Sequence, residues 1–275
     1  SYNGVALGIG VAISSTYSVG IGNGCSNSGD NSVAIGHASD ATGDSGVAIG
    51  RSSSSKKYSI AIGSNASIGG TDGKCISIGS NSSSTNNSVS IGPGTTASAG
   101  SSVGIGVLTN VSGSWGIGIG SGSTVSAQDG VAIGKSATAS AQNAIAIGNS
   151  TNASGTGGVS IGYNTKTTAT SSQYTTYINT GTTSTGSDNN YSVVIGNGSI
   201  LEKDASKCVA IGATAKSSNS KDSVSIGSST STSNSGSSIA IGHKSYTSNA
   251  LYGVALGSNA YVKGENGVAI GSVHK

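Results

Sequence analysis

The chain has 275 residues, of which 46 are Gly and 8% are charged, and its formal net charge is +3. Its 13 basic residues are scattered, which argues against the basic stripe of a nucleic-acid-binding protein. No apolar run is long enough to cross a membrane as a helix, so we expect no membrane insertion.

One short unit recurs eighteen times along the chain: an aliphatic residue, a small residue, a second aliphatic residue and Gly. In chain order it occupies residues 5–8, 19–22, 33–36, 47–50, 60–63, 76–79, 89–92, 103–106, 117–120, 131–134, 145–148, 159–162, 193–196, 209–212, 224–227, 239–242, 254–257 and 268–271. The closing glycines are mostly 14 residues apart. The one large gap, Gly162 to Gly196, contains Ile178 and Gly181, which indicate a degenerate unit there.

Alternation of period 2 inside each unit predicts a strand rather than a helix. A repeat of 14 residues accommodates two short strands and tight turns, but it is too small for a core of its own and must stack on its neighbours. We therefore expect an all-β fold, a parallel β-roll or β-solenoid with coils of about 14 residues. It should form a single solenoid over 1–275, as a fragment of a longer one, with an irregular excursion at 163–192.

The columns of the repeat predict which side chains share a face. Counting from the closing Gly as zero, positions −3 and −1 are always Val, Ile or Leu, and we expect them to fill the coil interior. Position −2 is Ala, Gly or Ser except at Val194, and position −4 is usually small, so this face should pack closely against another surface. Cys25, Cys75 and Cys208 stand in small-residue columns and are predicted to be unpaired.

Aromatic residues recur at position −5, as Tyr17, Tyr58, Trp115, Tyr191 and Tyr252. They either cover a coil corner or form an exposed ladder for glycan or protein contact. The excursion at 163–192 concentrates further tyrosines, including Tyr174 and Tyr177, and is either a protruding ligand-facing feature or a decorated coil with no role.

Chemistry-bearing side chains do not cluster. His37 and His243 each follow a repeat Gly and lie thirteen repeats apart, and no acid recurs where it would sit beside a base. Acidic residues are sparse and do not form the motif of calcium-binding rolls. We expect no enzyme activity, no catalytic residue, no metal and no cofactor.

The stretch from Asn31 to Gly50, NSVAIGHASDATGDSGVAIG, resembles the head repeats of trimeric autotransporter adhesins, the YadA-like heads, whose pattern is NSVAIGxxS. The resemblance implies a left-handed roll, three chains per head, surface display and adhesion. From the residue columns we expect the small −4/−2 face to pack near the three-fold axis of such a trimer. In that family the motif is associated with collagen and matrix binding. Together with the excursion, it nominates these binding residues: Asn31, Ser32, Val33, Ala34, Ile35, Gly36, His37, Ser39, Tyr174 and Tyr177.

The sequence therefore predicts a homotrimeric adhesin or fibre head at a cell or virion surface. Its partner would be an extracellular matrix protein, or a cell-surface receptor or glycan, bound through the lateral surface. The alternative is a passive spacer or filament subunit without a ligand of its own. Ice binding would need a continuous Thr column, whereas Thr is dense only around 165–185.

Overall fold

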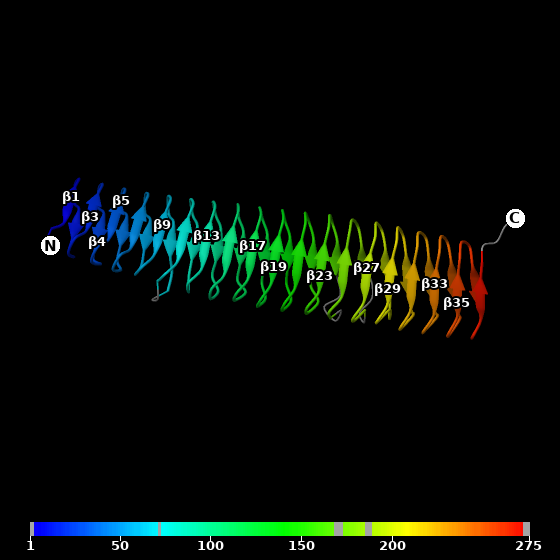
Figure 1. Cartoon of the computed structure of the whole chain (residues 1–275). Helices are drawn as coiled ribbons and strands as arrows, with labels where there is room; N and C mark the ends of the chain where they lie inside the picture. The colour runs from blue at the N-terminus through cyan, green and yellow to red at the C-terminus, as the bar shows by residue number, and fades with distance from the viewer. Residues whose placement is uncertain (1–2, 71–72, 168–172, 185–188, 272–275) are drawn as a thin grey trace. The chain divides into compact units, whose positions relative to one another are not determined.

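The computed structural model describes residues 3–70, 73–167, 173–184 and 189–271. The chain divides into two compact units, Ser1–Ser136 and Ala137–Lys275. In both units each coil contributes one strand from the repeat unit and one from the segment that follows it, and the strands pair in parallel with the next coil (Figure 1). The predicted all-β solenoid is confirmed.

Two sheets make up each unit, and we call them sheet A, built from the repeat units, and sheet B, built from the segments between them. Sheet A of the first unit contains β1 (Val5–Leu7), β3 (Val19–Ile21), β5 (Val33–Ile35), β7 (Val47–Ile49), β9 (Ile60–Ile62), β11 (Ile76–Ile78), β13 (Val89–Ile91), β15 (Val103–Ile105), β17 (Ile117–Ile119) and β19 (Val131–Ile133). Sheet B of this unit contains β2 (Ala12–Ile13), β4 (Ser26–Asn27), β6 (Asp40–Ala41), β8 (Ser54–Ser55), β10 (Ser67–Ile68), β12 (Ser83–Ser84), β14 (Thr96–Ala97), β16 (Asn110–Val111) and β18 (Thr124–Val125).

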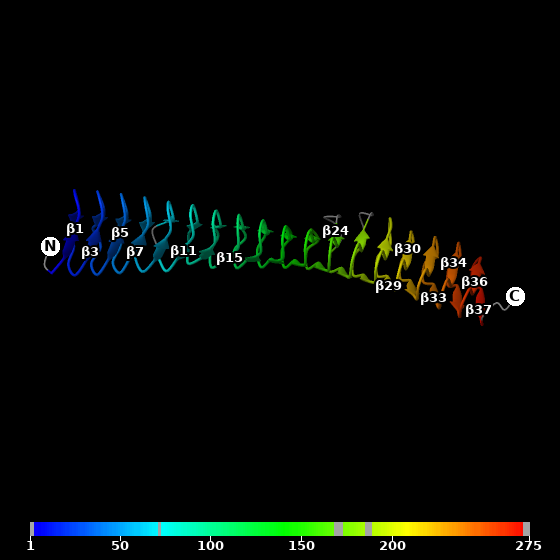
Figure 2. The same cartoon turned by 90° about the horizontal axis from the view of Figure 1, so that it is seen from above.

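The second unit repeats this arrangement, with even-numbered strands above and odd-numbered strands below in Figure 2. Its sheet A contains β21 (Ile145–Ile147), β23 (Val159–Ile161), β25 (Thr176–Ile178), β27 (Val193–Ile195), β29 (Val209–Ile211), β31 (Val224–Ile226), β33 (Ile239–Ile241), β35 (Val254–Leu256) and β37 (Val268–Ile270). Its sheet B contains β20 (Thr138–Ala139), β22 (Asn152–Ala153), β24 (Lys166–Thr167), β26 (Thr183–Ser184), β28 (Ile200–Leu201), β30 (Lys216–Ser218), β32 (Ser231–Ser233), β34 (Tyr246–Ser248) and β36 (Tyr261–Lys263).

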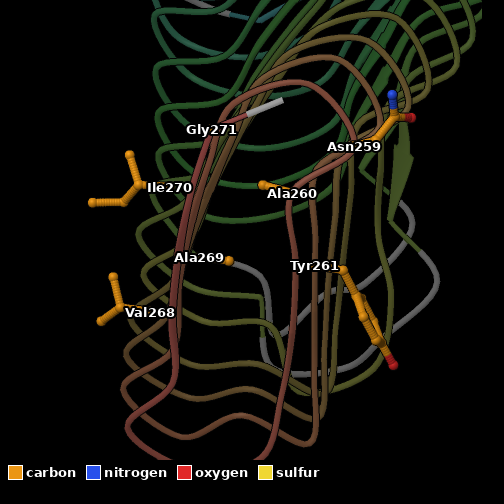
Figure 3. A pocket seen from close by; sticks show the side chains of 7 residues that line it. All are labelled: Asn259, Ala260, Tyr261, Val268, Ala269, Ile270 and Gly271. Atoms are coloured by element: carbon orange, nitrogen blue, oxygen red, sulfur yellow. The ribbon is translucent and has the colours of Figure 1, made fainter. Parts of the chain in front are cut away.

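The two faces of sheet A are the reverse of what the sequence columns suggested. The small residues at position −2, such as Ala34 and Ala132, are fully buried inside the coil, while the flanking aliphatics point outward. Ile117 and Ile119, for example, are each 37% exposed. Figure 3 shows the same alternation at the end of the second unit, where Ala269 points into the coil and Val268 away from it. The prediction that the large aliphatics fill the interior, with the −4/−2 face turned toward a partner, was wrong.

The interior is too narrow for large side chains on both strands, and this explains the small columns. At Gly118 an added Cβ would lie 2.8 Å from Val111 Cγ2, closer than carbon atoms pack without strain. The −2 glycines of these coils thus leave room for the Val residues of sheet B. Elsewhere in the unit Ala34 packs with Cys25, Ala41 and Ala48, whereas Ala61 packs with Ala66, Ile68 and Cys75, so each coil fills the same small cross-section in a different way.

The closing Gly is required by the stacking of coils. At Gly36 the backbone has φ of 134°, and an added Cβ would lie 2.5 Å from the carbonyl oxygen of Gly50 in the next coil. A side chain there is therefore excluded both by backbone conformation and by the neighbouring coil. This double constraint is why the glycine recurs with the period of the coil.

The gap between Gly162 and Gly196 holds the extra coil that Ile178 and Gly181 indicated. β25 pairs with β23 on one side and β27 on the other, with Ile178 beside Ile161 and Ile195. Both coils of this interval are longer than the usual repeat, and their interior is larger: Tyr177, Val194 and Leu201 are all fully buried there. Residues 168–172 and 185–188, on which the predicted protrusion depends, lie outside the described residues.

Candidate binding surface

The exposed surface of each unit has three parts: the outer aliphatic face of sheet A, the outer face of sheet B, and the turns. Sheet B is polar on its outer face over most of its length, with half-buried residues such as Thr96, Thr124 and Thr138. In the second unit this face ends in a pair of stacked rings, Tyr246 and Tyr261, with centroids 5.5 Å apart.

The predicted binding residues are divided between these surfaces and the interior. Asn31 and His37 lie exposed on turns, and Tyr174 is 52% exposed. Val33 and Ile35 are half-buried on the outer face of sheet A, with Gly36 next to them. By contrast, the side chains of four residues are buried inside the coil and cannot reach a ligand: Ser32, Ala34, Ser39 and Tyr177. The structure therefore leaves Asn31, His37 and Tyr174 as the accessible polar or aromatic groups of the set.

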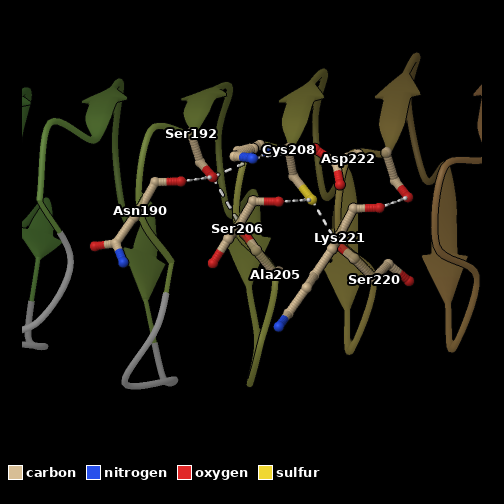
Figure 4. A network of polar contacts seen from close by, with 10 residues as sticks. Asn190, Ser192, Ala205, Ser206, Cys208, Ser220, Lys221 and Asp222 are labelled. Atoms are coloured by element: carbon tan, nitrogen blue, oxygen red, sulfur yellow. Dashed lines mark hydrogen bonds and ion pairs between the residues drawn. The ribbon is translucent and has the colours of Figure 1, made fainter.

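Buried Ser side chains at position −4 tie successive coils together, a role that the sequence columns did not suggest. Ser192 Oγ donates to the carbonyl of Ala205 at 3.1 Å and accepts from Cys208 N at 3.0 Å (Figure 4). One coil later Cys208 Sγ donates to the carbonyl of Ser220, and after it Ser223 Oγ donates to that of Ser235. The side chains of Ser192, Cys208 and Ser223 are thus satisfied by the next coil's backbone.

Cys208 follows the same pattern with sulfur in place of oxygen, and burial raises the pKa of its thiol. Cys25, Cys75 and Cys208 are all buried and free, as predicted. Because these side chains point into the coil rather than outward, they cannot form a disulfide with another chain without opening the coil.

Position −5 forms a corner column with a left-handed backbone. The residues here have positive φ whether they are Asn31 (56°), Asp129 (56°) or Tyr191 (54°). Asn and Asp tolerate this conformation, whereas for a bulky aromatic residue it is unfavourable. The aromatic residues of the column are nevertheless exposed: Tyr17, Tyr58, Trp115, Tyr174, Tyr191 and Tyr252. Their rings therefore contribute little to the core.

In the second unit the corner column brings aromatic and charged groups together. Tyr174 and Tyr191 stack with ring centroids 5.4 Å apart and planes within 15°. In the next two coils Lys207 Nζ lies 4.0 Å from Asp222 Oδ1. Beside Tyr191 a hollow of about 230 Å³ is lined by Asn190, Tyr191, Ser206, Lys207, Lys221 and Asp222.

Other charged groups form inter-coil pairs. Lys216 Nζ lies 2.6 Å from Glu202 Oε1, and Ser218 Oγ donates to the same carboxylate, so the pKa of Glu202 is held below its usual value. In the first unit the backbone N–H and hydroxyl of Thr16 both donate to Asp30, which lowers the pKa of that carboxyl. Within the described residues no group of His, Cys, Asp and Glu could hold a metal ion, and no helix could span a membrane.

A family model, the YadA head domain repeat, matches the sequence at several places. The matched ranges are 28–53, 51–66, 116–137, 126–151, 139–165, 153–172, 233–260 and 248–272. The matched parts of the chain, 28–66, 116–172 and 233–272, are YadA-like head repeats. The first matched range contains the motif from Asn31 to Ser39.

A solved structure, the collagen-binding domain of the Yersinia adhesin YadA, aligns over 84% of this chain and 73% of that one at 22% identity, with a TM-score of 0.22. A TM-score this low does not establish a shared overall structure. No curated protein matches the chain.

Proposed function

We propose that this YadA-like head is a homotrimeric surface adhesin without enzyme activity, displayed outside the cell, and that it binds an extracellular matrix protein of the collagen type. The observation that carries the proposal is the combination of head repeats with a long outward face of aliphatic side chains on sheet A. Monomeric proteins rarely expose continuous apolar surface of this kind.

The aliphatic face of sheet A supports self-association rather than ligand binding. Its residues stack in register from coil to coil, as Val33 and Ile35 do on Val47 and Ile49, so the face is flat and repetitive. Identical chains can bury such a face through closed symmetry, and the number three follows from the family. The trimer interface we propose is therefore the opposite face from the one that the sequence columns favoured.

Light scattering tests the assembly. We expect the mass of three chains, and a monomer mass of 26.2 kDa at micromolar concentration would contradict the proposal. Ile119→Ser should shift the equilibrium toward monomer because it places a hydroxyl in the proposed interface while leaving the coil interior intact.

Binding to immobilised collagen tests the ligand. We expect His37→Ser to weaken binding several-fold, because His37 is an exposed side chain of the NSVAIGxxS motif. Lys135→Ser is the matched control, since Lys135 is also exposed and occupies the same position after its repeat Gly. If the trimer assembles but binds neither a matrix protein nor a cell-surface receptor or glycan, the alternative function, a passive spacer, is correct.

A further inference from the structure

The hollow beside Tyr191 has features that neither folding nor assembly explains. Tyr191 has φ of 54° and is 60% exposed, and Tyr174, stacked on it, has φ of 51° and is 52% exposed. Many other coils place Asn, Asp or Ser at this corner, residues that adopt the conformation more easily. Four coils elsewhere also carry an aromatic residue there, but the stacked pair of Tyr174 and Tyr191 lies beside a hollow lined by two lysines. Strained residues held in place by a rigid scaffold are often found where ligands bind.

The groups around the hollow favour an anionic ligand. Lys207 and Lys221 provide two ammonium groups against the single carboxylate of Asp222. The Lys207–Asp222 pair is long and solvent-exposed, with side chains 65% and 55% accessible, so Lys207 can turn toward a ligand at little cost. Figure 4 shows the Lys221 side chain leaning toward the preceding coil, which carries Ser206, and both residues line the hollow.

Neutral hydrogen-bonding groups complete the lining. The Oδ1 of Asn190 accepts from Gln173 N at 2.7 Å, which fixes the amide so that its Nδ2 can donate outward. The ring of Tyr191 offers an electron-rich face, which attracts the C–H groups of a saturated ring. At about 230 Å³ the hollow is smaller than the pockets of drug-sized ligands, which begin at about 300 Å³, and has room for one ring.

We infer that this hollow binds a pyranose that carries a carboxylate. The C–H face of the sugar packs on Tyr191, the carboxylate lies between Lys207 and Lys221, and the hydroxyls bond to Asn190 and Asp222. The inference rests on the proposed adhesin function in that it names a glycan class for the surface of the same head. An acidic sugar fits better than a neutral one because only the former neutralises the second lysine.

Saturation-transfer NMR on the full chain tests this with two probes, methyl β-D-glucuronide and methyl β-D-glucoside, which differ at the carboxylate. We expect transfer to the glucuronide to exceed transfer to the glucoside at least fivefold. Tyr191→Asn should reduce the glucuronide signal at least fivefold, while Tyr252→Asn, in the same column with φ of 58°, should not. Since Asn tolerates this backbone, both variants should fold, and circular dichroism checks that they do.

Lys221→Gln should lower the glucuronide signal to that of the glucoside. Equal signals from the two probes with the unmodified chain, or equal losses in Tyr191→Asn and Tyr252→Asn, would overturn the inference. Competition by a hyaluronan tetrasaccharide or by sialyllactose identifies which natural carrier of the carboxylate is accepted, and failure of both to compete also overturns it. If the chain gives the glucuronide signal but binds no matrix protein, the result counts against the proposed function alone. If it binds a matrix protein but gives no glucuronide signal, the result counts against this inference alone.

Discussion

Three glycines of the first unit separate the effects of backbone conformation and coil stacking. Gly120 closes a repeat with φ of 128°, and a Cβ there would lie 2.5 Å from the carbonyl oxygen of Gly134. Gly122 has φ of 67° with its nearest neighbour, Ser136 Oγ, at 3.8 Å. Gly100 has neither a positive φ nor any atom within 4 Å of an added Cβ. Alanine therefore adds backbone strain and a steric clash at Gly120, backbone strain alone at Gly122, and neither at Gly100.

For Gly120→Ala we expect a loss of about 2–6 kcal/mol, combining about 1–3 kcal/mol of backbone strain with a steric penalty of similar size. For Gly122→Ala the left-handed conformation costs about 1–2 kcal/mol, of which about 0.4–1 kcal/mol is recovered because Ala restricts the unfolded chain. Gly100→Ala should be stabilising by about 0.4–1 kcal/mol.

Denaturant unfolding followed by circular dichroism measures this order. Because a stack of repeats can unfold in more than one step, the midpoint of the first transition is compared rather than an extrapolated free energy. If Gly120→Ala unfolds at the same denaturant concentration as Gly122→Ala, close stacking of coils is not what requires the closing Gly.

Three further predictions concern the interior and the charges. Ala132→Leu should destabilise the fold of the chain by about 1–3 kcal/mol and lower its unfolding midpoint, because Ala132 is fully buried in the coil and a larger side chain overpacks it. A loss of assembly with an unchanged unfolding midpoint would contradict this. Cys208→Ser should stay within about 1 kcal/mol, since Ser fills the same hydrogen-bonding role in neighbouring coils, and the native Cys208 thiol should react with labelling reagents only after denaturation. Because the pKa of Glu202 is lowered in the folded state, its ion pair with Lys216 stabilises the fold above the ordinary Glu pKa, and this stabilisation is lost as the pH falls through the folded pKa. The unfolding midpoint of Glu202→Gln should therefore fall less on acidification than that of a Glu265→Gln control, which changes an exposed turn residue.

The sequence predicts the coil but not which side of it is inside. A motif such as VAIG at 33–36 establishes strand, period and register, because successive copies pair residue for residue. Period-2 alternation says that Val33 and Ile35 share a face, but it does not say whether that face is inside. The rule that apolar residues are buried failed because a 14-residue coil encloses too little space for aliphatics on both strands. The signal that could have decided it is that small residues fill columns in both segments of the repeat, Ala34 in one and Ala41 in the other.

The turns could be predicted in part from the residue types at the corner. The frequent Asn, Asp and Ser at position −5 indicate a left-handed corner, and all described residues of that column have positive φ. Two of the aromatic exceptions, Tyr174 and Tyr191, could be located from sequence, but their stacking and the hollow beside them depend on which side chains neighbouring coils bring to the corner. Tyr177 was selected with Tyr174 because both lie in a Tyr-rich segment. The two are three residues apart, and Tyr174 lies exposed on a corner whereas Tyr177 is buried inside the coil.

The inverted faces also restrict where a head of this kind can bind a ligand. If the aliphatic face of sheet A is covered by other copies of the chain, Val33 and Ile35 serve assembly, and Ala34 between them is buried in its own coil. The recurrence of the motif along the chain then follows from folding and association, and ligand recognition is left to the outer face of sheet B and the turns. Those are the places where the repeats differ most from one another, as Thr138, Lys166 and Tyr246 do at equivalent positions of sheet B. A binding site on such a head is therefore expected to involve a few adjacent coils, as the corner at Tyr191 does, rather than to repeat along its length.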